Sequence, residues 1–330
     1  MGRRPTFAPQ RGHAGAIMIA YVLGRLLAAI PVLSAVAVFV FLLLSLVPGD
    51  PAVVIAGDLA TPEQVEAIRR SLALDRPLVE RFVTWLGHML TGDFGNSLFS
   101  GIAVSELIVQ RIEPTLVLAL MTIVIAVGVA VPLGLVSAYH PTGIVARLTM
   151  AGAVLGFSLP VFVVAFGLVY VFALGLGWFP VQSYVPLSQG LAGTLYSLVL
   201  PSVAVSFLYI ALIARVTRAA VLEVLREDYV RTAHAKGLSA RLILTRHVLR
   251  NAAVPVITII GIGFAALLGG VVVTETVFSI PGLGRLTADS ILRRDYPVVQ
   301  ALILLFSTVY VVVNLAVDIA YVLVDPRIRY

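Results

Sequence analysis

Long uncharged, mostly apolar stretches alternate with shorter charged segments along the chain. A helix needs about 20 apolar residues to cross about 30 Å of hydrocarbon. The stretches that reach this length are 26–47, 115–139, 148–214, 252–274 and 296–317. The third is too long for one crossing and carries Gly, Pro, Trp and Gln residues in its middle, so it predicts two helices around an uncharged loop. The pattern predicts an all-α polytopic membrane protein with six transmembrane helices.

The composition agrees with a chain that lies in a membrane. Of its 330 residues, 60% are hydrophobic and 12% are charged, whereas a soluble domain has about 45–50% apolar and about 25% charged residues. The mean hydropathy is +1.03. The sequence contains no cysteine, which excludes disulfides, thiolate metal ligands and cysteine nucleophiles.

The basic residues predict the orientation of the spans. Lys and Arg collect in cytoplasmic loops because they resist translocation. With the N-terminus inside, the predicted inner segments hold 15 of the 23 basic residues and the outer segments hold 8. Both termini are therefore expected in the cytoplasm. The net charge is +6. Because the basic residues that give this charge are scattered between apolar runs, we expect no nucleic-acid partner.

These signals predict the organisation of the chain. We expect a cytoplasmic N-terminal segment, a first transmembrane helix, a helical extracytoplasmic loop, a five-helix core and a cytoplasmic tail. The corresponding ranges are 1–25, 26–47, 48–114, 115–325 and 326–330, and the core contains a cytoplasmic loop at 215–251.

The loop between the first two spans has helix signals of its own. Thr61 is a typical N-cap, Pro62 suits the first helical position and Gln64 completes a capping box before an amphipathic run. A second helix is predicted over 77–90. We expect a helical extracytoplasmic subdomain, which either docks a partner or braces the helix ends.

No motif for catalysis or metal binding is present. The histidines at 13, 88, 140, 234 and 247 lack the spacing of metal ligands. The sequence also lacks a Gly-rich Lys-Ser/Thr loop, a Gly-x-Ser-x-Gly elbow and a His-Glu-x-x-His motif. We therefore expect no catalytic residue, no metal site and no enzymatic activity in this chain.

The cytoplasmic loop at 215–251 has a basic, helical pattern that Gly237 interrupts. Such a segment is typical of an amphipathic helix on anionic lipid. The residue types alone favour this interpretation. The alternative is two short helices that meet at a glycine and project from the membrane, since glycine adopts a left-handed turn without a steric penalty.

Four separated motifs carry a resemblance to a known family. They are Val47-Pro-Gly-Asp-Pro51, Gly92-Asp-Phe-Gly-Asn-Ser97, the segment Asp228-Tyr-Val-Arg-Thr-Ala-His-Ala-Lys-Gly-Leu238 with Arg246-His-Val-Leu-Arg-Asn251 and Pro255, and Glu275-Thr-Val-Phe-Ser-Ile-Pro-Gly-Leu-Gly284. Their order resembles the permease subunits of binding-protein-dependent ABC importers of the dipeptide, oligopeptide and nickel group. His234 departs from the family, which more often has Arg there.

The resemblance implies a function and a set of partners. It implies a permease subunit of the bacterial plasma (inner) membrane that forms half of a translocation pathway for di- or oligopeptides. A homologous second permease, two cytoplasmic ATPase subunits or one fused pair, and an extracytoplasmic binding protein would complete the importer. This chain would hold no cofactor, because ATP and Mg²⁺ would bind to the ATPase subunits. Nickel chelates and glutathione are alternative cargoes, and an ion-coupled secondary transporter or a non-transporting assembly protein is a less favoured function.

The resemblance also assigns the residues that couple the permease to the ATPase. They are Asp228, Tyr229, Arg231, Thr232, Ala233, Lys236, Gly237 and Leu238. Two further acidic residues stand at or within predicted spans, where a charge costs at least about 2.5–3.5 kcal/mol on insertion scales. We expect Glu275 to cap or pair with the outer turn at 278–284, and Asp318 to reach an Arg near the inner surface.

Overall fold

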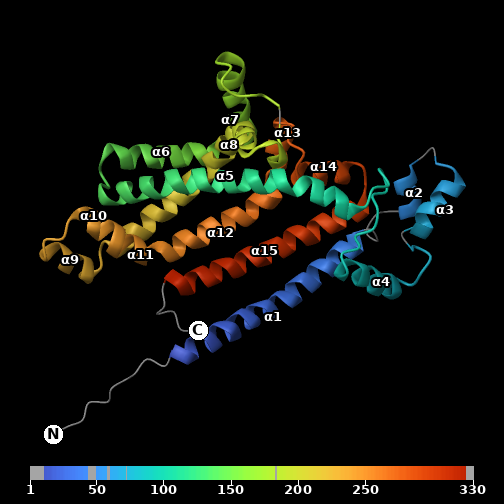
Figure 1. The fold of residues 1–330 in the computed structure, drawn as a ribbon, viewed down its shortest axis with the longest axis horizontal. Helices are drawn as coiled ribbons and strands as arrows, with labels where there is room; N and C mark the ends of the chain where they lie inside the picture. The colour runs from blue at the N-terminus through green and yellow to red at the C-terminus, as the bar shows by residue number, and fades with distance from the viewer. Residues whose placement is uncertain (1–10, 44–49, 58–59, 72, 183, 325–330) are drawn as a thin grey trace, which may run out of the picture.

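The computed structural model describes residues 11–43, 50–57, 60–71, 73–182 and 184–324. The first ten residues, the Val47-Pro-Gly part of the first motif and the predicted tail 326–330 lie outside these ranges. The described chain is a bundle of long helices that run roughly side by side, with short helices at both ends (Figure 1).

Five helices give the bundle its length. They are α1 (Arg11–Leu43), α5 (Val104–Tyr139), α8 (Leu191–Val224), α12 (Ala253–Gly270) and α15 (Tyr296–Val324). Of the described residues, four helices are long and apolar enough to cross a membrane, or up to six if each of two bent helix pairs is one span. The six predicted transmembrane helices correspond to these four helices and two bent pairs.

The third predicted span is sharply bent. It consists of α6 (Ile144–Ser158), α7 (Val161–Leu168) and a π-helical turn at Val169–Gly175, and the two halves meet at 104°. Pro160 lacks a backbone N–H and forces its predecessor out of the helical region, and Leu159 has φ −90° and ψ 120°. As a result α7 turns away from the direction of α6 (Figure 1).

The centre of the bundle is the pair α5 and α8, which approach closely because small residues line their contact. Ala126 and Ala130 of α5 are fully buried in one cluster with Ile213 and Ala214 of α8. A Cβ added to Gly134 would lie 2.6 Å from Cβ of Thr217, so this position has no room for a side chain. Small residues allow such close contact of membrane helices.

The predicted helices of the loop between the first two long helices are present. They are α3 (Pro62–Ser71) and α4 (Leu78–Leu90), and a further short helix that was not predicted, α2 (Pro51–Ala56), precedes them. The capping box is confirmed, because the Thr61 N–H donates to Gln64 Oε1 over 2.9 Å and the Gln64 N–H donates to the Thr61 hydroxyl oxygen over 3.4 Å. α4 lies against the end of α1.

Short helices also form the segment between α8 and α12 and the segment between α12 and α15. Between α8 and α12 lie α9 (Asp228–Ala235), α10 (Ala240–Leu242), a π-helical turn at Ile243–Val248 and α11 (Leu249–Asn251). This end is opposite to the end that carries α2, α3 and α4 (Figure 1). Between α12 and α15 lie α13 (Val272–Val277) and α14 (Leu283–Leu292).

Candidate functional site

The segment from Asp228 to Leu238 forms a compact turn that we call the elbow. Its helix, α9, ends at Ala235, and Gly237 has a left-handed φ of +75°. The Gly237 N–H donates to the His234 carbonyl over 2.9 Å and the Leu238 N–H donates to the Ala233 carbonyl over 3.3 Å. These two bonds are the Schellman arrangement that closes a helix at a left-handed residue. Glycine is favoured at 237 for its backbone conformation, since a Cβ there would meet no atom within 4 Å.

The elbow stands on an apolar base. Val230 and Ala233 of α9 are buried, and their spacing of three residues places them on one face of the helix. They pack in one cluster with Val221 near the end of α8, Ala138 near the end of α5 and Ile243 of the π-helical turn. The elbow is therefore attached to the ends of the two central helices.

The polar side chains of the elbow face outward. Asp228, Arg231, Thr232 and Lys236 are exposed. The ion pair between Arg231 and Asp228 spans 3.3 Å, and 78% and 96% of the two side chains are accessible, so it contributes little to stability. This face carries both signs of charge and leaves its donors and acceptors available to another molecule.

Tyr229 and His234 bond within the elbow region. Nδ2 of Asn251 donates to the Tyr229 hydroxyl oxygen over 2.6 Å and to the His247 carbonyl over 2.8 Å, which connects α9 to α11. Nδ1 of His234 lies 3.0 Å from the Val230 carbonyl one turn earlier, as expected when that nitrogen carries the proton. Asn251 belongs to the motif that was recognised in the sequence, but its hydrogen bond to Tyr229 is evident only from the fold.

Glu275 lies at the opposite end of α12 from the elbow and is fully buried. One carboxylate oxygen accepts from the Thr115 hydroxyl over 2.7 Å, and the other accepts from the Arg285 N–H over 2.8 Å. The Thr115 hydroxyl oxygen in turn accepts from the Leu283 N–H over 2.8 Å. Two of the free N–H groups at the start of α14 are thereby satisfied, as a helix N-terminus requires. A Cβ on Gly282 would overlap this carboxylate.

Asp318 of α15 is buried and paired with Arg25 of α1. Nε of Arg25 lies 2.7 Å from one carboxylate oxygen, and Nη2 donates to the other over 3.0 Å. The two bonds make a bidentate pair, the strongest form of Arg–carboxylate contact. The partner predicted only as an Arg is thus a residue of the first long helix, and the pair joins α1 to α15.

Further polar contacts at the end of the bundle opposite to the elbow were not evident in the sequence. Glu113 Oε1 accepts from the Tyr184 hydroxyl over 2.6 Å and from the Leu187 N–H over 2.8 Å, which attaches the segment between α7 and α8 to α5. Asp295 accepts from the Ser97 hydroxyl and from the Leu98 N–H. These partners are between 71 and 198 residues apart in the chain, so no local pattern predicts them.

The described residues contain no group of three or more His, Cys, Asp or Glu side chains that could hold a metal ion. What this arrangement offers is mechanical: an exposed polar elbow at one end of α8 and α12, and a hydrogen-bonded turn at the other end of α12.

Comparisons with known proteins identify the family. Residues 130–330 match the family described as binding-protein-dependent transport system inner membrane component, and residues 18–119 match the N-terminal region of such membrane components. The "Probable peptide ABC transporter permease protein y4tP" of Sinorhizobium fredii is 50% identical over 310 residues, which cover 94% of this chain and 99% of that protein.

Two more distant matches extend the comparison. The glutathione transport system permease protein GsiC of Salmonella paratyphi A is 43% identical over 313 residues, covering 95% of this chain and all of GsiC. A solved structure of the inward-facing MetNI methionine ABC transporter shares the fold with a TM-score of 0.54 at 17% identity, over 66% of this chain and 96% of that one. The chain therefore belongs to the inner-membrane permease components of binding-protein-dependent ABC transport systems, and it is a multi-pass inner-membrane protein.

Proposed function

We propose that this permease forms half of the translocation pathway of an ATP-driven peptide importer, and that the elbow couples it to a cytoplasmic ATPase. The observation that carries the proposal is the division of the elbow into two faces. Val230 and Ala233 join it to the cluster at the ends of α5 and α8, while Arg231 and Lys236 face outward. A rigid element of this kind transmits a displacement from its exposed face to the helices beneath it.

The partners follow from this mechanism. Two ATPase subunits, or one fused pair, would bind ATP and Mg²⁺ and seat the elbow, since this chain carries no nucleotide-binding loop. A homologous second permease would supply the other half of the pathway. An extracytoplasmic binding protein would deliver cargo to the opposite end of the bundle.

The topology that the mechanism requires has six spans, both termini in the cytoplasm and α2, α3 and α4 on the extracytoplasmic side. The distribution of basic residues, 15 inside and 8 outside, supports it. A reporter fused at Arg226 tests this arrangement. Activity of a cytoplasmic reporter is expected, and activity of an exported reporter alone would contradict the six-span topology.

For the cargo, we propose di- or oligopeptides, because the relative at 50% identity is named as a peptide permease. Glutathione is the second candidate, favoured by the 43% identity to a glutathione permease. Glutathione is a tripeptide with one γ-linked peptide bond, so a pathway wide enough for an α-linked tripeptide has room for it.

The test is uptake by the complete importer, purified through this chain and reconstituted in proteoliposomes with its binding protein. We expect ATP-dependent accumulation of a labelled dipeptide or oligopeptide, with unlabelled glutathione and a nickel chelate as competitors. Accumulation that requires an ion gradient and no ATP would contradict an ATP-driven importer. Uptake of glutathione or nickel chelate without peptide uptake would contradict the assignment of peptide as the cargo.

A further inference from the structure

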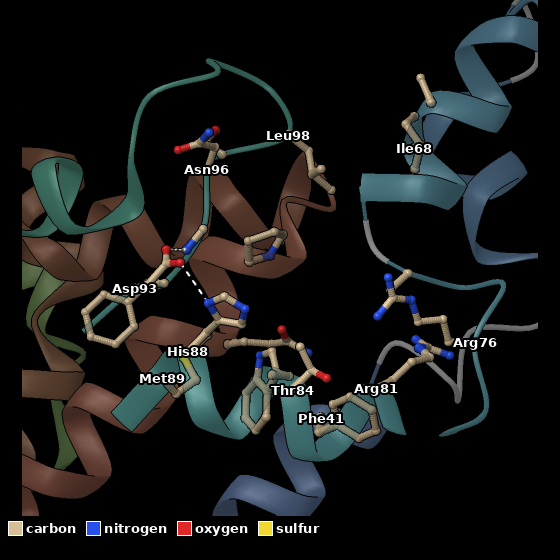
Figure 2. A pocket seen from close by; sticks show the side chains of 18 residues that line it. Phe41, Ile68, Arg76, Arg81, Thr84, His88, Met89, Asp93, Asn96 and Leu98 are labelled. Carbon is tan, nitrogen blue, oxygen red and sulfur yellow. Dashed lines mark hydrogen bonds and ion pairs between the residues drawn. The ribbon is translucent and has the colours of Figure 1, made fainter. Parts of the chain in front are cut away.

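A large open groove lies at the end of the bundle that carries α2, α3 and α4. It has a volume of about 760 Å³. Its floor contains Phe41 near the end of α1 and Pro297 and Gln300 in the first turns of α15. One wall is α4, which contributes Trp85. Figure 2 shows that Arg81, Thr84 and His88 belong to the same wall. The loop at 93–98 and part of α3 complete the lining.

Two hydrogen-bond donors on α4 are buried without a partner. Nε of Arg81 and Nε1 of Trp85 are both shielded, and neither has a hydrogen-bond acceptor among the residues that the structure describes. The two residues are four apart on one helix and therefore lie on the same face, next to Phe41. The Arg81 guanidinium carbon stands 5.7 Å from the centre of the Phe41 ring, and the two side chains lie together in Figure 2. A buried donor without an acceptor lowers stability, and a bound acceptor would restore it.

The charges around the groove favour an anion as that acceptor. Arg76 also lines it, and its side chain pairs with Glu80 over 3.3 Å, with both side chains about half exposed. Asp93 is already occupied, because it accepts from the Gly95 N–H over 3.0 Å and pairs with Nδ1 of His88 over 2.9 Å (Figure 2).

The surroundings of Arg81 disfavour the charged form of its guanidinium. Burial lowers the pKa of its guanidinium, and the negative charge of Asp75 opposes part of that effect. The cation is thus partly buried beside the groove, and Asp75 compensates the effect of burial only in part. An anionic ligand would supply the missing charge.

The aromatic residues of the floor indicate where this groove lies relative to the membrane. The ring centres of Phe41 and Phe82 are 5.2 Å apart, and those of Phe41 and Trp85 are 5.5 Å apart. Phe41 belongs to an apolar span, and Trp85 and Arg81 belong to an amphipathic helix above it. Trp is enriched at the level of lipid headgroups, where its ring is apolar and its N–H is polar.

We propose that this groove binds a phosphate group, with the Arg81 guanidinium and the Trp85 indole N–H as donors. The phosphate arrives either on an anionic lipid of the outer leaflet, whose acyl chains would follow α1, or free in solution. Guanidinium suits this chemistry because its planar donors match phosphate oxygens and it stacks on aromatic rings. The proposal is independent of the cargo and of the elbow.

The experiment titrates the detergent-solubilised full chain with three probes and follows binding by native mass spectrometry. The probes are phosphatidylglycerol, a diacylglycerol with the same acyl chains and no phosphate, and sodium phosphate. We expect phosphatidylglycerol to bind more tightly than the diacylglycerol. Sodium phosphate that displaces the lipid would show that the phosphate alone is sufficient. Failure of sodium phosphate to compete would assign the site to the lipid.

Matched variants test the donors. Arg81→Gln is expected to weaken phosphatidylglycerol binding about tenfold, as for a charge-assisted hydrogen bond, and Trp85→Phe about threefold, as for a neutral one. Arg70→Gln removes the same charge from the exposed part of α3, outside the groove, and is expected to change the affinity less than twofold. Trp85→Phe keeps the ring and so reports on the site even if Arg81→Gln fails to fold. Equal binding of phosphatidylglycerol and diacylglycerol, or an equal loss in Arg70→Gln and Arg81→Gln, would overturn the proposal.

Discussion

The elbow and the turn around Glu275 occupy opposite ends of the same helix, α12, and they use polar residues in opposite ways. The elbow buries apolar Val230 and Ala233 and leaves charged side chains exposed. The turn around Glu275 buries the carboxylate of this residue and satisfies it with Thr115 and the Arg285 N–H. The polar groups of this turn thus stabilise the fold, whereas those of the elbow are available to a partner. Substitutions at the turn around Glu275 should therefore lower the stability of the fold. Substitutions on the exposed face of the elbow should instead impair coupling to the ATPase.

The largest loss of stability is expected for Gly282→Ala. The backbone of Gly282 is extended, so alanine fits its conformation, but its Cβ would overlap the Glu275 carboxylate. Overpacking costs about 1–3 kcal/mol, and displacing the carboxylate from its donors costs a similar amount. We expect a lower melting temperature of the solubilised chain and lower abundance in the membrane. Gly269→Ala is the control, because a Cβ there meets no atom within 4 Å. Equal melting temperatures of the two variants would contradict the packing of this turn.

Thr115→Val should have the next largest effect. Valine keeps the shape of threonine but removes the hydroxyl that connects Glu275 to the Leu283 N–H. The two buried groups left without a partner should lower the free energy of unfolding by about 1–3 kcal/mol. Thr115→Ser keeps the hydroxyl and should melt closer to the wild type. A serine variant as unstable as the valine variant would show that the methyl group, not the hydroxyl, matters.

The pair between Arg25 and Asp318 should show a smaller, asymmetric effect. Arg25→Gln leaves a buried carboxylate without its partner, whereas Asp318→Asn removes the buried charge itself. We expect Arg25→Gln to cost about 1 kcal/mol, discounted because 52% of its side chain is accessible, and Asp318→Asn to cost less. Adding Asp318→Asn to Arg25→Gln should raise the melting temperature again. Strict additivity in this double-mutant cycle would show that the two residues do not stabilise each other.

The smallest change in stability is expected on the exposed face of the elbow. Arg231→Gln removes a side chain that is 78% accessible, so the free energy of unfolding should change by no more than about 0.5 kcal/mol, as for a surface substitution. Co-purification of the ATPase subunits should nevertheless decrease. Arg226→Gln offers a control just before α9, also exposed. If both variants retain the ATPase equally, Arg231 is not part of the docking face.

Features that depend on neighbouring residues were predictable from the sequence, and those that depend on distant ones were not. The capping box at Thr61 and the left-handed turn at Gly237 follow from a few adjacent residues, and both are present. The contact between Thr115 and Glu275 joins residues 160 positions apart, and the pair of Arg25 and Asp318 joins residues 293 positions apart. Hydropathy indicated that such charges need a partner, but only the packing of the helices selects it.

The bend at Pro160 shows a second limit. A proline in an apolar stretch predicts a kink, but the angle depends on what the following helix packs against. Here α7 contacts α8 and α13, so the chain turns by 104°. The exposed face of the elbow was predicted through its resemblance to a family motif, because its residue types alone favour a helix on anionic lipid.

The central claim is that the elbow transmits force, and Gly237 tests it most directly. Its left-handed φ of +75° is unfavourable for a β-branched residue and tolerable for asparagine. Gly237→Val and Gly237→Asn are compared in the reconstituted importer by measuring ATP hydrolysis and peptide uptake together. We predict that both variants insert normally, that Gly237→Asn retains uptake, and that Gly237→Val loses it, either with ATPase subunits absent or with hydrolysis that no longer drives transport. Normal peptide uptake by Gly237→Val with the ATPase subunits bound would contradict the account.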